Sequence, residues 1–189
     1  MTRQHGPTVR QFLARATRDI HETLHHDPIL SRLNSTHIRP DEYHAALTIL
    51  GRFVCAVERE RLRYDLFAAF TLDPLCTAVS ADLGGPLAAE APLALRDPAA
   101  LLGALYVAHG AAFGRNSFRK TVTRALPEMR HAFVNLRMAT AQWQGLIAAL
   151  EEAGEDPAGL NSLLLGAQSA FDCVRHLCDA APLRPVIAE

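Results

Sequence analysis

The sequence predicts an all-α fold in a single domain, residues 1–189. Aromatic residues make up only 6% of the chain, and no stretch alternates apolar and polar residues over the length of a strand. Apolar residues instead recur at spacings of three and four, which is the period of an amphipathic helix. A chain of 189 residues has the usual length of one domain. With 49% hydrophobic residues it can form a core without disulfides or metals.

The first helix is expected between Pro7 and Pro28, because proline suits a first helical turn and breaks a later one. A second helix is expected over residues 40–70, where acidic residues at positions 41 and 42 suit the positive N-terminal end of the helix dipole. The apolar stripe of the first helix consists of Val9, Phe12, Leu13, Ala16, Ile20 and Leu24.

The rest of the chain is divided by its prolines and glycines, which punctuate helical patterns. We expect, in order, a short and broken segment over 74–92 around Gly84-Gly85-Pro86, a helix opened by Asp97-Pro98, a helix over 128–152 after Pro127, and a last helix from Asp156-Pro157 that Pro182 and Pro185 close.

Charge and cysteine content exclude several classes of protein. Nineteen basic and twenty acidic residues give a formal charge of −1, so the chain lacks the basic excess of proteins that bind nucleic acids or anionic membranes. The N-terminal segment is rich in arginine and has no apolar run, so neither a signal peptide nor a membrane span is expected. Four scattered cysteines without a CxxC motif predict free thiols and a cytoplasmic protein.

A histidine pair in the first helix is one candidate for chemistry. His21 and His25 are four residues apart, so both can face one ligand or metal. His21 also lies next to the apolar stripe, where an imidazole must find a hydrogen-bond partner or bind something. The alternative is an ordinary surface or core histidine, since no HExxH zinc motif surrounds the pair.

Glycines inside a helical pattern are the second candidate. Gly103, Gly110 and Gly114 interrupt the helix that begins after Asp97, and each costs about 0.5–1 kcal/mol relative to alanine. Gly110 and Gly114 are four residues apart and share one face. They predict a groove that admits either a flat ligand or, as the alternative, a tightly packed helix.

Together, these two segments resemble the haem oxygenase family. The run from Phe12 to His21, with Thr17 four residues before the histidine, is similar to the proximal helix of that family. The run Leu102-Gly-Ala-Leu-Tyr-Val-Ala-His-Gly-Ala-Ala-Phe-Gly114 is similar to the distal helix of its bacterial, bacteriophytochrome-associated branch. Chain length, helix order and the late Ala170-Phe171 pair agree with this resemblance.

The resemblance implies a haem oxygenase-like fold that holds haem between a proximal and a distal helix, with His21 as iron ligand and catalytic residue. Haem would be both cofactor and substrate, cleaved with O2 to biliverdin, carbon monoxide and ferrous iron. Electrons would come from an external reductase or ferredoxin, and the product would supply a bacteriophytochrome or release iron. The other implied haem contacts are Arg18, Tyr106, Gly110, Ala111, Gly114, Arg137 and Phe171, with Arg18 or Arg137 binding a propionate.

The distal run departs from the family at three positions. His109 replaces an acidic residue, and beside Gly110 it is expected to point away from the haem. Ala111 replaces a serine. Arg115 replaces a glycine, and its long side chain is expected either to extend into solvent or to reach a propionate. Three hypotheses follow: a haem oxygenase, a non-catalytic haem-binding sensor or carrier of the same fold, and a haem-free helical interaction module.

Overall fold

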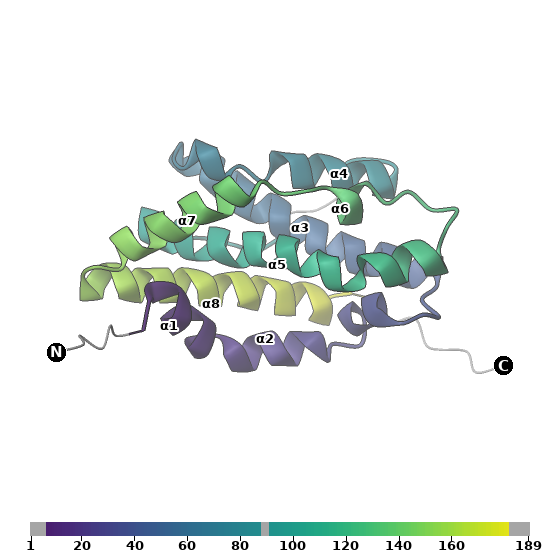
Figure 1. The fold of residues 1–189 in the computed structure, drawn as a ribbon, viewed down its shortest axis with the longest axis horizontal. Helices are drawn as coiled ribbons and strands as arrows, with labels where there is room; N and C mark the ends of the chain where they lie inside the picture. Colours follow the sequence, from purple (N-terminus) through teal and green to yellow (C-terminus); the bar gives the residue numbers. More distant parts are fainter. Residues whose placement is uncertain (1–6, 88–90, 182–189) are drawn as a thin grey trace.

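The computed structural model describes residues 7–87 and 91–181, and these residues contain helices and no strand. The prediction of an all-α fold is therefore confirmed. Figure 1 shows one layered bundle of long helices, with α5 and α8 side by side through its middle. The elements are α1 (Val9–Ala16), α2 (Arg18–His25), the 3₁₀ helix η1 (Leu30–Asn34), α3 (Pro40–Tyr64), the 3₁₀ helix η2 (Ala68–Phe70), α4 (Asp73–Leu83), α5 (Pro98–Ala125), α6 (Ala132–Asn135), α7 (Thr140–Ala153) and α8 (Pro157–Asp179).

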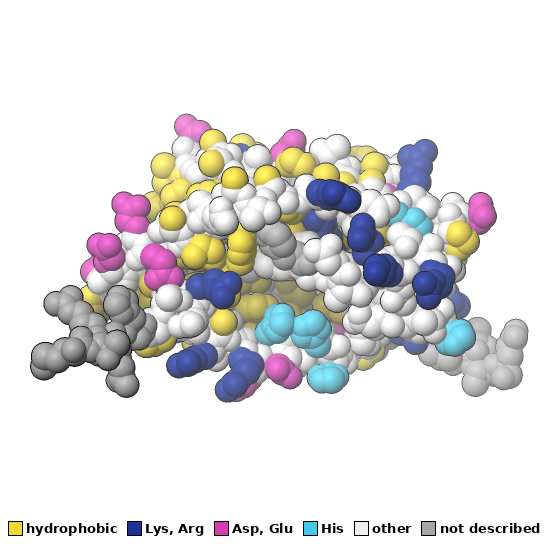
Figure 2. Space-filling model, in the orientation of Figure 1, with side chains coloured by type: hydrophobic (Ala, Val, Ile, Leu, Met, Phe, Trp, Pro, Cys, Tyr) yellow, Lys and Arg dark blue, Asp and Glu magenta, His cyan; other side chains and the backbone are white. Residues whose placement is uncertain are grey.

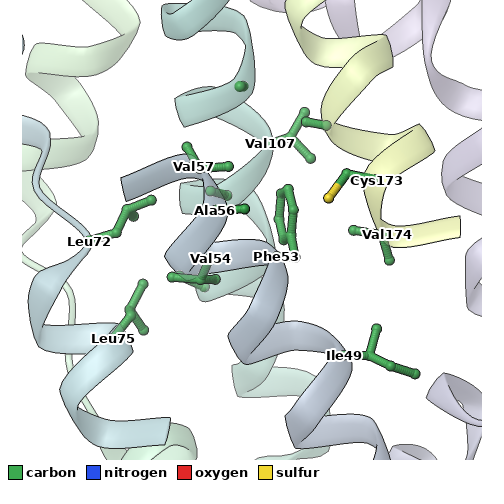
Figure 3. Close-up of a cluster of buried hydrophobic side chains, with 14 of the residues drawn as sticks. Ile49, Phe53, Val54, Ala56, Val57, Leu72, Leu75, Val107, Cys173 and Val174 are labelled. Atoms are coloured by element: carbon green, nitrogen blue, oxygen red, sulfur yellow. The ribbon is translucent and has the colours of Figure 1, made fainter. Parts of the chain in front are cut away.

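Glycines let α5 and α8 pack closely. A Cβ atom at Gly103 of α5 would collide with the carbonyl oxygen of Leu163, and one at Gly166 of α8 would collide with that of Ala100. The core continues onto α3, where Phe53 lies next to Val107 of α5 (Figure 3). Gly103 is therefore a packing glycine. For the glycines of this helix the sequence allowed either a ligand groove or a tightly packed helix, and Gly103 is used for helix packing.

The starts of α5 and α8 confirm the sequence prediction, because both are fixed by local contacts. The Asp97 carboxylate accepts a hydrogen bond from the N–H of Ala100 at 2.8 Å, and Asp156 caps α8 in the same way through Ala158 and Gly159. An aspartate cap followed by proline satisfies or removes the free N–H groups of a first turn. Pro182 and Pro185, which were expected to close the last helix, lie outside the described residues.

The first predicted helix is divided in two at Thr17. The Thr17 hydroxyl donates to the carbonyl of Leu13 at 2.8 Å, and its backbone has φ −109° and ψ 6°. A buried threonine bonded back to the preceding turn bends a helix. The predicted apolar stripe continues from α1 onto α2, but the axes of the two helices point in different directions (Figure 1).

The second predicted helix ends at Tyr64, and the prediction that it continues to Phe70 is wrong. Asp65 and Phe67 both have positive φ angles, 52° and 56°, which reverse the chain. The buried carboxylate of Glu58 then holds the returning segment, because it accepts hydrogen bonds from the Thr71 hydroxyl and the Leu72 N–H, both at 2.8 Å.

The helix predicted over 128–152 is also wrong in its first half, where the structure has short α6 and an extended link over 136–139 before α7. The buried carboxylate of Asp82 accepts the N–H groups of Ala132 and Phe133 at 2.7 and 2.9 Å. The guanidinium of Arg115 donates to the carbonyls of Phe133 and Leu136. Contacts with distant side chains therefore replace helical hydrogen bonds in this stretch.

In the described part of the chain, none of the helices combines the length and apolarity that a bilayer-spanning segment requires. All four cysteines carry free thiols, with Cys173 and Cys178 buried and the other two half-buried.

Candidate functional site between α2 and α5

Helix α2 borders an open cleft. It packs against η1 and α8, yet none of its residues is fully buried, and its apolar residues Ile20 and Leu24 are only half-buried. Figure 2 shows the surface hollowed above α2, with histidine side chains gathered along the rim that α2 forms. In Figure 1, α8 runs beside α2, and α5 lies beyond α8 and packs along it. An apolar helix face left partly uncovered is a feature of ligand-binding clefts.

His21 is exposed on α2 and contacts two other rings. Its centroid is 4.4 Å from that of His25, with the ring planes at 87°, and 5.9 Å from that of Phe171 on α8. Partial desolvation lowers the pKa of His21, and the neighbouring His25 lowers it further. Both effects favour the neutral imidazole, which is the form that ligates iron or another metal. The structure thus brings together two predicted site residues that lie 150 positions apart in the sequence.

Two glycines of α5 lie away from its contacts with other helices. Among the parts of the chain that the structure describes, no atom lies within 4 Å of a Cβ built at Gly110 or Gly114, so both glycines border open space. Ala111 beside them is exposed. These two glycines differ from Gly103, which is in tight contact with α8. The arrangement leaves room for a flat group to lie against the helix backbone.

Tyr106 lies one turn before Gly110 and is half-buried against α7. Its ring stacks on Trp143 with centroids 5.9 Å apart and planes at 23°. Burial raises the pKa of Tyr106, and the positive charge of Arg10 on α1 opposes that effect. Trp143 and Arg10 were not among the predicted site residues, because only the fold brings α1 and α7 to α5.

The two predicted propionate ligands lie in different places. Arg18 is exposed at the start of α2, where its Nε is 4.0 Å from a carboxylate oxygen of the exposed Asp19. Arg137 is also exposed, but it lines a cavity together with Arg115 and Arg119. At 3.6 residues per turn, Arg119, nine positions after Gly110, lies on the side of α5 opposite to that glycine.

The other substituted positions of the distal run are buried. His109 is only 1% exposed, and its Nε2 lies 3.0 Å from the carbonyl oxygen of Phe70, so the side chain points into the core as expected. Arg115 is only 2% exposed. The expectation that Arg115 extends into solvent is wrong, because its buried guanidinium donates to the carbonyls of Ala112, Phe133 and Leu136. The alternative, a contact with a propionate, stays a prediction.

The protein ligands that the cleft offers to a metal are the imidazoles of His21 and His25, and not a cluster of several ligand types. Within residues 7–87 and 91–181, no three His, Cys, Asp or Glu side chains come together in a way that could hold a metal ion. A metal carried by a flat macrocycle needs only one protein ligand, because the macrocycle supplies the others. Comparison of the chain with protein-family models, curated proteins and solved structures gives no match.

Proposed function

We propose that the chain binds haem in the cleft between α2 and α5, with the imidazole of His21 as the axial ligand, and cleaves it as a haem oxygenase-like enzyme. Two observations support the proposal: His21 on α2 is exposed and its lowered pKa favours the neutral imidazole, and Gly110 and Gly114 on α5 border open space. The resemblance of both segments to the proximal and distal helices of that family supports it.

The residues present fit a porphyrin. Ile20 and Leu24 are apolar and half-buried, and the apolar Phe171 is buried beside His21, as an apolar macrocycle requires. Gly110 and Gly114 permit close approach of the ring because no Cβ atom projects from them. Phe171 touches the His21 ring edge-on and limits its rotation. A bound iron porphyrin would supply the oxygen-binding iron and the ring carbon that is oxidised.

The roles of the chain's own residues follow from this placement. His21 would hold the iron through one ring nitrogen, leaving the other free to donate a hydrogen bond. Ala111 and the two distal glycines have no polar side-chain atom, so these three residues would order water on that side through their backbone groups alone. Electrons come from outside, by way of a reductase or ferredoxin. Biliverdin, carbon monoxide and ferrous iron are the products, and a bacteriophytochrome is a candidate recipient of biliverdin.

A second candidate function is haem binding without turnover, as a sensor or carrier. The observation that favours it is the orientation of His109, whose imidazole is buried against Phe70 and cannot deliver a proton to the cleft. Gly110 and Ala111 have no titratable side chain, and His109 points into the core. Positions 109–111 therefore offer no acid or base to the distal side.

The binding step is tested by titrating the purified protein with hemin and recording the Soret band. A saturable, histidine-ligated spectrum is expected, and the His21→Ala variant should lose it. Because His25 lies beside His21, the double variant His21→Ala/His25→Ala excludes substitution by the neighbouring imidazole. His44→Ala, on the exposed side of α3, is the matched control and should behave as the wild type. An unchanged spectrum in the double variant would contradict the ligand assignment, and no histidine-ligated band at all would indicate the haem-free helical module.

Turnover is tested separately, with the hemin complex, a ferredoxin with its reductase, and O2. Biliverdin absorbance and carbon monoxide trapped by added ferrous myoglobin would support the oxygenase. A stable ferrous complex with bound O2 and no carbon monoxide would identify the non-catalytic haem binder.

A further inference from the structure

A second cavity lies on the other side of α5, between its C-terminal half and residues 134–138. Its volume is about 270 Å³. Three arginines, Arg115, Arg119 and Arg137, line it together with two asparagines, Asn116 and Asn135, and no carboxylate is among its lining residues. The haem proposal makes no use of this cavity, because Gly110 and Gly114 lie on the opposite side of the helix.

Arg115 is a buried cation that forms no ion pair with any acidic residue in the described part of the chain. It is 2% exposed, and its guanidinium donates to three backbone carbonyls and lies 4.7 Å from the centroid of the Phe133 ring. A guanidinium has five N–H donors, so further donors remain for the cavity that this side chain lines. Burial lowers the pKa of Arg115 to about 10, the direction that desolvation of a cation produces.

Arg119 and Arg137 add to this uncompensated charge. The Nε of Arg119 is buried and has no hydrogen-bond partner among the residues that the structure describes. Arg137 is exposed at the cavity. Removing a charged group from water costs several kcal/mol unless a counter-charge and hydrogen bonds replace the solvent. An anion that bridges the guanidinium groups would supply both.

We propose that this cavity binds a phosphate-class oxyanion, held by Arg119 and Arg137 with Arg115 at its base. A tetrahedral dianion matches the site in charge, because up to three cations face it. It also matches in geometry, because its oxygens can accept hydrogen bonds from guanidinium groups in different directions, and guanidinium pairs well with phosphate. The side-chain amides of Asn116 and Asn135 can donate to the remaining oxygens.

The proposal is tested by calorimetric titration of the full chain, without haem, with inorganic phosphate at constant ionic strength. We expect saturable binding in the millimolar range or tighter, and at least tenfold weaker binding by Arg119→Gln and by Arg137→Gln. Arg124→Gln, which removes an exposed charge that does not line the cavity, is the matched control and should bind as the wild type does.

Two further titrations define the ligand. Glycerol phosphate in place of inorganic phosphate distinguishes a phosphate monoester from the free ion, and the one that binds more tightly identifies the source. Acetate at the same ionic strength should bind at least tenfold more weakly than phosphate. The proposal is overturned if phosphate shows no saturation up to 20 mM, if Arg119→Gln and Arg124→Gln bind equally, or if acetate binds as well as phosphate. Because haem is absent from these titrations, their outcome is independent of the proposed function.

Discussion

The imidazole of His109 on α5 is hydrogen-bonded to the carbonyl oxygen of Phe70 on η2, with Nε2 and O 3.0 Å apart. This contact ties the helix that carries the cleft glycines to the segment that follows α3. Because a carbonyl oxygen can only accept a hydrogen bond, this contact requires a proton on Nε2 of His109. The other ring nitrogen, Nδ1, is buried and has no hydrogen-bond partner within residues 7–87 and 91–181.

His109 should make the protein less stable in acid. Desolvation lowers the pKa of His109, so the unfolded chain takes up the proton more readily than the folded one. The unfolding free energy is therefore highest above the unfolded pKa, about 6.5, and falls as the pH drops below it. His109→Gln keeps an N–H donor but does not titrate, so its unfolding free energy should fall less between pH 7.5 and 5. Urea unfolding at both pH values measures the difference, and the same fall in wild type and variant would contradict it. His44→Gln is the exposed control.

Glu58 should be among the most important polar residues for stability. Burial alone would raise the pKa of its carboxyl, but hydrogen bonds from Arg61, Leu72 and Thr71 outweigh it and hold the pKa below its ordinary value. Glu58→Gln removes the carboxylate that is ion-paired with the buried guanidinium of Arg61, so we expect a loss of about 3 kcal/mol at pH 7 by urea unfolding.

The pH dependence of this loss has a definite sign. A carboxylate with a lowered pKa stabilises the fold above its unfolded pKa, about 4.3, and this contribution disappears as the pH falls through the folded value. The difference between wild type and Glu58→Gln should therefore shrink below pH 4.3. Asp172→Asn breaks an exposed pair with Arg175 and should change stability by less than about 1 kcal/mol. Equal losses in the two variants would show that Glu58 has no special role.

The glycines of α5 should respond to alanine in opposite directions. Gly103→Ala places a methyl group against the carbonyl of Leu163, and this overpacking should cost about 1–3 kcal/mol. Gly110→Ala meets open space, so it should gain about 0.5–1 kcal/mol of helix stability. Thermal and urea unfolding of the two variants test this contrast. Destabilisation by Gly110→Ala would mean that the cleft is closed in solution.

A larger side chain at Gly110 should block haem without harming the fold. Gly110→Leu fills the space in front of α5, so we expect at least a tenfold loss of hemin affinity with no fall in melting temperature. Arg124→Leu is the control, since it adds the same side chain to an exposed position further along α5. Equal hemin affinity in the two variants would place the porphyrin elsewhere.

The sequence predicts the fold best where structure is determined locally. The starts of α5 and α8 are predictable because Asp97 and Asp156 cap helices whose first residue is proline. The end of α3 and the link before α7 are not, because they depend on Glu58 and Asp82, whose hydrogen-bond partners lie 14 and 50 or more positions away.

The same distinction holds for the candidate site. Spacing alone places Gly110 and Gly114 on one face of a helix, and the structure shows that this face is open. No spacing, however, indicates that Phe171 touches His21. Nor does it indicate that Arg115 turns into the protein, because its acceptors are carbonyls of a non-helical segment.

The break at Thr17 and the absence of any fully buried residue on α2 have a practical consequence. A segment anchored by half-buried side chains can open without unfolding the bundle, so it is where a protease will first cut the empty protein. A compound that fills the cleft would hold this segment down and slow the cut. Limited digestion can therefore serve as a screen for occupants, including colourless ones that leave no trace in an absorption spectrum.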